Sequence, residues 1–329
     1  MERSSPAPVT MEDEKWARAA GAIEAAMGKA VAQGRRRRAK VERDKAKARA
    51  GAADYEPGIV TFIDVLGFRA MLIDRSAGEI HDIILSLREF TTPDVKQFRR
   101  MKEVRLSSRA FAESVSDAVV RVRVFNTQYS DGAFFQELLD LLHIQIQCIN
   151  HGVLVRAGLA IGSVHVGLNG SGPVFGPAMV RAFDIESGEA IYPRIVVDEA
   201  AYEQFLSDAR LHNENHDLEE ETEYVNRLLR IGEDGTRFID YLGASEDEYD
   251  AFEDYIAFLD RHAALIRLNL AEVRKPTIRR KYLWLASYHN DIVSQIRLRF
   301  EAGELSAVNF LALVGREAAD VLGELIVHF

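Results

Sequence analysis

The segment from Ile59 to Leu66 constrains the fold most strongly, because it is a β-branched apolar run that contains one ionisable residue, Asp64. A short run of this kind, ended by Gly67, is typical of a buried strand. A buried carboxylate without a partner is energetically costly. A divalent metal would compensate the charge of Asp64, and the N–H groups of the next turn could then hold phosphates carried by the metal. The alternative is an aspartate that caps the following helix.

A second acidic segment precedes the apolar run that starts at Ala118. Glu113 and Asp117 are separated by an even number of positions, so on a strand they would share a face. Two carboxylates on adjacent strands can hold two metal ions, an arrangement that suits phosphoryl transfer. The alternative is a solvated hairpin turn closed by its polar residues.

A third segment combines a strand, a glycine-rich loop and a helix. The pattern predicts the strand over 154–166, the loop over 167–176 and the helix over 178–187. Taken alone, this order is an ordinary crossover of an α/β fold.

The remaining pattern adds helices at both ends of this α/β region. Ala, Glu, Lys and Arg dominate residues 11–53, which predicts a helix there. From residue 69 to the C-terminus, the pattern predicts helices over 69–90, 133–150, 245–273, 277–302 and 304–328, a strand over 194–197, hairpins over 104–124 and 224–242, and a loop or solvated helix over 212–223. The predicted domains are a basic helical extension (1–55), an α/β domain (56–243) and a helical region (244–329).

The order of these features resembles the class III nucleotidyl cyclases over about residues 57–243. The residues that carry the resemblance are the F-x-D-x-x-G-F motif at 62–68, Asp117, Arg156-x-Gly158 and Gly176. The resemblance implies a ferredoxin-like α/β cyclase domain with N- and C-terminal helical extensions. It also implies the site: catalytic and metal-binding aspartates at Asp64 and Asp117, a metal-binding backbone carbonyl at Val65, triphosphate-binding amides at Gly67 and Phe68, and a phosphate-binding side chain at Arg156.

Base selection in this family depends on two positions, which here are Glu113 and Pro173. Adenylyl cyclases typically have Lys and Asp there, which disfavours ATP. An ionised Glu113 only accepts hydrogen bonds, so it favours the N–H donors of uracil N3 or guanine N1 and would repel the acceptor at cytosine N3. Phe62, on the same strand face as Asp64, could stack on a smaller base or fill the space beside it.

The transition-state Asn and Arg of the family fall at Val180 and Asp184, and neither matches. We predict that Arg181 substitutes for them. With the segment from Lys281 to Asn290, the chain is most similar to the pyrimidine (uridylate or cytidylate) cyclases of the bacterial Pycsar antiphage system.

This similarity implies a lyase that converts UTP to 3′,5′-cyclic UMP and pyrophosphate with two Mn²⁺ or Mg²⁺ ions per site. It further implies a homodimer with each site between two protomers, and a second-messenger role in antiphage defence. Cytidylate or guanylate cyclase activity is the alternative within the family. A degenerate cyclase fold that senses a nucleotide without turnover is an alternative of another class.

Composition sets the remaining expectations. The single cysteine, Cys148, excludes a disulfide framework and a multi-cysteine zinc site. No apolar run reaches the ~18 residues of a membrane span, and the N-terminus lacks the apolar core of a signal peptide, so we expect a cytoplasmic protein without a membrane partner. Residues 1–54 hold 13 Lys and Arg against 8 Asp and Glu. No aromatic residue lies among the arginines at 35–38, which favours a solvated helix over a nucleic-acid-binding arm.

Overall fold

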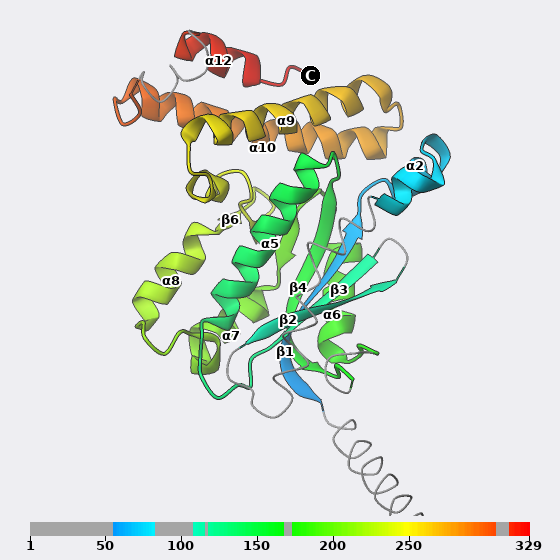
Figure 1. The fold of residues 1–329 in the computed structure, drawn as a ribbon, viewed down its shortest axis with the longest axis vertical. Coiled ribbons are helices and arrows are strands. Elements are labelled where there is room, and N and C mark those ends of the chain that lie inside the picture. The colour runs from blue at the N-terminus through cyan, green and yellow to red at the C-terminus, as the bar shows by residue number, and fades with distance from the viewer. Residues whose placement is uncertain (1–54, 83–107, 116–117, 168–172, 307–315) are drawn as a thin grey trace, which may run out of the picture. The chain divides into compact units, whose positions relative to one another are not determined.

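The computed structural model of the chain describes residues 55–82, 108–115, 118–167, 173–306 and 316–329 (Figure 1). The chain divides into two compact units, Met1–Asp54 and Tyr55–Phe329, and every described residue belongs to the second. The helix predicted over 11–53 therefore lies outside the described residues.

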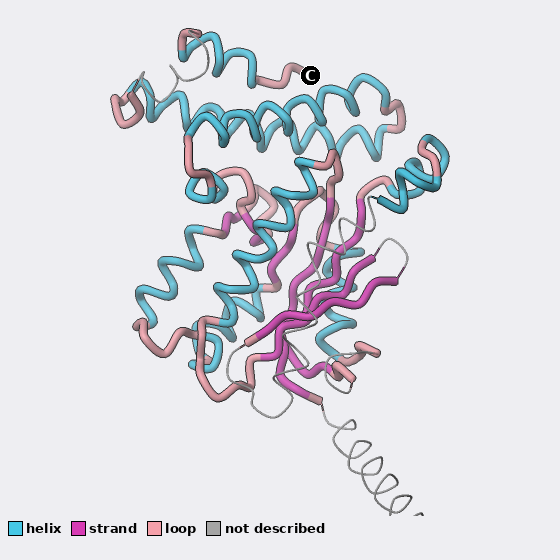
Figure 2. The backbone as a smooth tube through the Cα atoms, in the orientation of Figure 1, coloured by secondary structure: helices cyan, strands magenta, loops and turns pink. Residues whose placement is uncertain are grey.

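A seven-stranded sheet forms the centre of the described residues (Figure 2), with the strand order β2-β3-β1-β4-β5-β7-β6. The strands are β1 (Glu56–Val65), β2 (Arg109–Val115), β3 (Ala118–Val124), β4 (Val155–Val164), β5 (Ile195–Val197), β6 (Leu229–Ile231) and β7 (Arg237–Ile239). Neighbouring strands are antiparallel except β4 and β5, which are parallel. This mixed sheet with helices around it confirms the predicted α/β class.

The helices α5 (Ala133–Asn150) and α6 (Pro177–Gly188) cover opposite faces of the sheet. Ile59 and Ile63 of β1 belong to the larger apolar core together with Leu138 of α5. Val60 belongs to a second core together with Ala182 of α6. Because side chains alternate along a strand, the even-numbered positions of β1, Asp64 among them, face α6.

Close packing of α6 on the sheet depends on two glycines that the sequence analysis singled out. A Cβ at Gly158 would lie 2.3 Å from the backbone oxygen of Ala182, so only glycine fits under this helix. Gly176, which precedes α6, has a φ of 147°, and a Cβ there would lie 2.6 Å from the backbone oxygen of Ser163. These glycines allow the strand, the loop and the helix to stack directly.

The predicted helix over 69–90 is wrong as a continuous element. The helix α2 covers Phe68–Asp74 and is followed by a break. Ser76 donates its N–H and Oγ–H to Glu79 Oε2 at 2.8 and 2.7 Å, and its Oγ accepts from the Glu79 N–H at 3.3 Å. This capping box begins a new helical turn, which explains why one apolar pattern spans two helical segments. Residues 83–107 lie outside the described residues.

The middle of the chain follows the prediction closely, with two differences. The helix α5 has the predicted bounds, and β4, β5 and α6 end within two residues of theirs. The helix α8 (Leu218–Arg227) starts within the segment predicted as a loop or solvated helix over 212–223, in agreement with the helical alternative, and continues beyond it, so the hairpin β6–β7 is shorter than predicted. The helix α7 (Glu199–Ser207) is an element that the hydrophobic pattern did not indicate.

The C-terminal helices belong to the same compact unit as the sheet. They are α9 (Phe252–Glu272), α10 (Pro276–Glu301) and α12 (Ala318–Leu325), and Figure 1 shows them beyond the end of the sheet at which β1 stops. The Trp284 ring of α10 stacks on Tyr192 with 4.9 Å between ring centroids. The Leu242 N–H donates to Tyr288 Oη at 3.0 Å, which fixes α10 beside the end of β7.

Two further observations concern the composition. Cys148 is buried on α5, and burial raises the pKa of its thiol to about 12. Within the part of the chain that the structure describes, no helix combines the length and apolar character needed to cross a bilayer.

Candidate functional site

Charged side chains from β1, β4 and α6 meet where β1 ends. Asp64 and Arg156 are Cα partners on the antiparallel strands. Arg156 Nε donates to Asp64 Oδ2 at 3.1 Å and lies 2.8 Å from Glu186 Oε1. The Asp64 and Arg156 side chains keep 22% and 24% of their exposure, whereas Glu186 keeps 4%. One guanidinium thus balances two carboxylates in a place that solvent still reaches.

The helix α10 adds a fourth charge, Lys281. Burial and the nearby Arg156 guanidinium lower the pKa of Lys281, whereas the Asp64 and Glu186 carboxylates act to raise it. The ammonium group therefore lies within electrostatic range of all three side chains. Sequence reasoning missed both Glu186 and Lys281 as members of this cluster. Glu186 lies two residues after Asp184, the position at which the family's arginine was expected, but no local signal pointed from Lys281 to Asp64.

Asp117, the second predicted metal ligand, lies outside the described residues. The residue that follows it, Ala118, is the Cα partner of both Asp64 and Val115. The register of β1 and β3 brings Ala118, the residue after Asp117, directly beside Asp64. The pairing of Asp64 with Asp117 itself stays a prediction.

The donor types at the end of β1 suit a hard divalent cation. Mg²⁺ and Mn²⁺ prefer carboxylate and carbonyl oxygens. The described residues supply the Asp64 carboxylate and the Val65 backbone carbonyl, and a two-ion site also requires Asp117. In the described ranges, no group of three or more His, Cys, Asp or Glu side chains is arranged to hold a metal ion.

Gly67 makes the turn between β1 and α2. Its φ of 79° is left-handed, a conformation that favours glycine, and its carbonyl accepts from the Met71 N–H at 3.1 Å. Phe68 is buried in the larger core and anchors the start of α2. The turn therefore has the predicted form, and its contact with a triphosphate stays a prediction.

The two positions predicted to select the base lie beside each other. Glu113 Oε2 accepts a hydrogen bond from the Val174 N–H at 2.9 Å, and Val174 directly follows Pro173. Glu113 is the Cα partner of Val120, which in turn is the partner of Phe62. Residues directly opposite each other share a face, so Glu113 and Phe62 lie in one row on the α6 face of the sheet.

Phe62 forms an apolar wall together with Phe183 of α6. The ring centroids are 5.2 Å apart at an interplanar angle of 81°, an edge-to-face contact. Phe183 keeps 47% of its exposure, so part of this wall remains open to solvent. On β1, Phe62 lies two residues before Asp64 and on the same face of the strand.

Arg181 lies apart from these residues. Its Nε and Nη2 donate to the two carboxylate oxygens of Asp198 at 2.9 and 2.8 Å, and Nη1 donates to Glu189 Oε1 at 2.9 Å. The hydrogen bonds and charge of Asp198 and Glu189 raise the pKa of Arg181. Its predicted catalytic role would require the guanidinium to leave these carboxylates, and that role stays a prediction.

No family model and no curated protein matches this chain. Among solved structures, it is similar to a monomeric crystal structure of a double mutant of the guanylyl cyclase domain of the RhoGC fusion protein from the aquatic fungus Blastocladiella emersonii. The sequences are 17% identical, the match covers 47% of this chain and 86% of that chain, and the TM-score is 0.32.

Proposed function

We propose that this protein is a nucleotidyl cyclase of the class III type that converts UTP to 3′,5′-cyclic UMP and pyrophosphate. The observation that carries the proposal is the Asp64–Arg156 pair at the solvent-accessible end of β1, next to the residue that follows Asp117. This pair supports the proposal because the carboxylate that we propose binds metal and the guanidinium that we propose binds phosphate lie side by side.

The chemistry needs positive charge around the triphosphate. Asp64 and the Val65 carbonyl, with Asp117, would hold two Mn²⁺ or Mg²⁺ ions, which when bound lower the pKa of the ribose 3′-hydroxyl and shield the triphosphate. The 3′-oxygen attacks the α-phosphorus in line, and the bond to the β-phosphate oxygen breaks as pyrophosphate leaves. Arg156 and Lys281, which lie near Asp64, would provide two positive charges to balance the negative charge that the leaving group gains.

Base choice in this proposal depends on Glu113. The Val174 N–H holds one carboxylate oxygen, which orients the group and leaves it an acceptor for the N3–H of uracil. Cytosine N3 has no hydrogen to donate, so CTP is disfavoured. Guanine N1–H would also match this acceptor, and a guanylate cyclase is therefore the second candidate.

The proposed active form is a homodimer in which Glu113 of one protomer reads the base held at Asp64 of the other. The cellular role that the sequence similarity suggests is synthesis of a second messenger in antiphage defence. Both statements follow from the family resemblance and require a test of their own.

The direct test of the proposed reaction uses the purified full chain with Mn²⁺ and each of ATP, GTP, CTP and UTP in separate incubations. Mass spectrometry identifies the products. Formation of cyclic UMP as the main product supports the proposal. Cyclic GMP as the main product would support the guanylate cyclase instead, cyclic CMP would contradict the role given to Glu113, and no cyclic product from any nucleotide would contradict the cyclase itself.

A further inference from the structure

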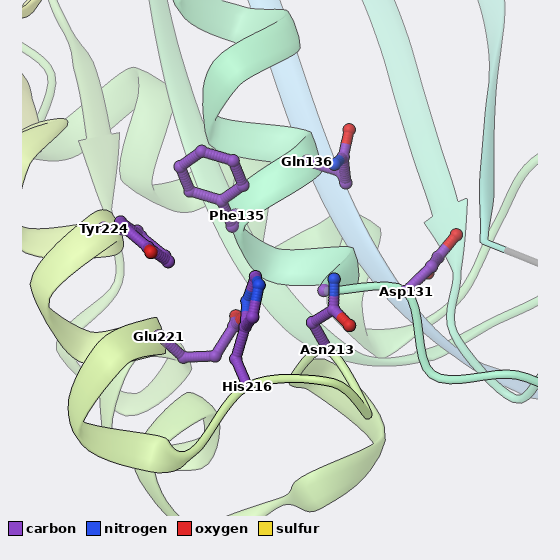
Figure 3. Close-up of a pocket in the computed structure, with 8 residues that line it drawn as sticks. Asp131, Phe135, Gln136, Asn213, His216, Glu221 and Tyr224 are labelled. Atoms are coloured by element: carbon purple, nitrogen blue, oxygen red, sulfur yellow. The ribbon is translucent and has the colours of Figure 1, made fainter.

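A cavity of about 250 Å³ lies between the start of α5 and the segment that leads into α8 (Figure 3). Its lining residues are Asp131, Gly132, Phe135, Gln136, Asn213, His216, Glu221 and Tyr224. The strand β3 begins beside Asp64 and runs away from it to Val124, before the chain reaches Asp131. Seven residues of strand span about 23 Å. The cavity therefore lies toward the other end of the sheet from the proposed active site.

Glu221 contributes a buried carboxylate to this cavity. Its exposed fraction is 2%, and its Oε1 accepts from His216 Nδ1 at 2.7 Å. Its other oxygen, Oε2, has no hydrogen-bond partner among the described residues. Oε2 lies 3.6 Å from the position that a Cβ of Gly132 would occupy, so the absence of a side chain at Gly132 leaves space beside it.

Asp131 also lines the cavity, and Figure 3 shows its side chain directed away from Glu221 and His216. Its Oδ2 accepts from the Ser108 N–H at 2.8 Å, whereas its buried Oδ1 has no hydrogen-bond partner in the described part of the chain. A β-bridge between Asp131 and Asn213 joins the two sides of the cavity. An unsatisfied buried acceptor carries a desolvation cost, so Glu221 Oε2 calls for a ligand that donates a hydrogen bond.

Aromatic rings form another part of the wall, beside the polar Gln136 and Asn213. The Phe135 and Tyr224 centroids are 6.1 Å apart at 54°, and the His216 and Tyr224 centroids are 5.4 Å apart at 65°. Aromatic faces attract cations, and a planar guanidinium also stacks on them. Arg227 lies 5.8 Å from the Tyr224 centroid but does not line the cavity and is ion-paired with Glu223.

The chemistry of the wall distinguishes an organic cation from a metal ion. The described residues contain no group of three or more acidic, histidine or cysteine side chains arranged around one point, which a metal ion would require. Carboxylate oxygens beside aromatic rings instead match a cation that has N–H donors and an apolar stem.

We propose that this cavity binds a small organic cation, an alkyl guanidinium or alkyl ammonium group. Its N–H groups donate to Glu221 Oε2, and its stem lies against Phe135 and Tyr224. Binding here does not depend on the cyclase reaction, because the cavity shares no residue with the Asp64 cluster.

The test is isothermal titration calorimetry of the full chain at low salt with butylguanidinium and with its neutral analogue of the same shape, N-butylurea. We expect butylguanidinium to bind at least about tenfold more tightly, because hydrogen bonds to a carboxylate are strengthened by charge on the donor. Glu221→Gln removes the carboxylate charge at nearly constant volume and should weaken butylguanidinium binding by a similar factor. The exposed Glu219 lies on the same helix, so Glu219→Gln is the matched control and should bind as the wild type does.

Equal affinity for the two probes, an unchanged dissociation constant in Glu221→Gln, or no binding of butylguanidinium would overturn the proposal. Circular dichroism checks that both variants remain folded. A third titration, with the blocked peptide Gly-Gly-Arg-Gly-Gly, separates the possible sources of the cation. Peptide binding as tight as that of butylguanidinium indicates a protein side chain, whereas binding of butylguanidinium alone indicates a free small molecule.

Discussion

Arg156 Nε lies 3.1 Å from Asp64 Oδ2, across the adjacent strands β4 and β1. The same guanidinium contacts Glu186 from the helix that covers this face. An aspartate in an apolar strand is tolerated because a partner charge is built into the neighbouring strand. The pair also remains partly open to solvent, which a purely structural ion pair does not need.

Glu113→Gln should change the base preference from UTP toward CTP. A glutamine oxygen can still accept from the Val174 N–H, while its amide N–H₂ can donate to cytosine N3. We expect kcat/KM for UTP to fall at least about tenfold, as for the loss of a hydrogen bond to a charged group, and kcat/KM for CTP to rise. Steady-state kinetics with both nucleotides measures the ratio. An unchanged ratio would remove Glu113 from the base-binding site.

Lys281→Met should slow turnover without weakening the fold. Methionine keeps most of the apolar stem and removes the positive charge near Asp64 and Arg156. We expect kcat/KM to fall at least about tenfold, because a charge that stabilises the leaving pyrophosphate is lost. The unfolding temperature should stay the same or rise, because removing the half-buried ammonium group also removes the cost of its partial desolvation.

The exposed Lys275 at the start of the same helix provides the control, Lys275→Met, which should keep wild-type kinetics. Equal kinetics of the Lys281→Met and Lys275→Met variants would show that Lys281 takes no part in the reaction.

Glu137→Gln should destabilise the fold. Glu137 is fully buried on α5 and accepts from Arg121 Nε at 2.7 Å and from Arg123 Nε at 2.8 Å. Removing its charge leaves two buried guanidinium groups that still pair with Asp140 but lose their shared, fully buried carboxylate. We expect a loss of about 3–5 kcal/mol in the free energy of unfolding, measured in urea. Glu203→Gln, at an exposed position, should change it by less than about 0.5 kcal/mol. Similar losses in the free energy of unfolding for the two variants would contradict the stabilising role given to Glu137 between Arg121 and Arg123.

Acid should destabilise the C-terminal helices through a buried histidine pair. His262 Nδ1 and His289 Nδ1 are 3.1 Å apart, His262 Nε2 lies 3.1 Å from Tyr241 Oη, and His289 Nε2 lies 3.0 Å from the Leu325 carbonyl. Burial lowers the pKa of His289 to about 4 and that of His262 well below its usual value near 6.5.

Below pH 6.5 the unfolded chain therefore binds protons that the folded chain does not. The stability from this pair is complete above pH 6.5 and falls as the pH drops toward 4, by about 1.4 kcal/mol per pH unit for each histidine. Urea unfolding at pH 7.5, 6 and 5 measures this slope. The His289→Gln variant should show a smaller slope than the wild type, and equal slopes would contradict the assignment.

The apolar pattern was sufficient for β1, α5 and α6, because α5 and α6 each bury one regular face and β1 is an apolar run buried on both faces. It was not sufficient for the charged cluster, because Lys281 reaches Asp64 only after α10 packs across the end of the sheet. Glu221 shows the same limit: it lies in an acidic segment predicted to be a loop or solvated helix, yet it is buried against α5. Ser76 differs from these, since its capping box with Glu79 was readable in the sequence but was masked by an apolar pattern that continues across the break.

The most direct test of the central claim is the rate of cyclic UMP formation from UTP and Mn²⁺ by the wild type, Asp64→Asn and Asp82→Asn. Asp82 is 80% exposed and provides a matched control for the loss of one carboxylate. The account predicts that the wild type and Asp82→Asn form cyclic UMP at similar rates, whereas folded Asp64→Asn protein forms none above background. Equal rates for all three proteins would contradict the assignment of Asp64 as the metal-binding carboxylate of a cyclase.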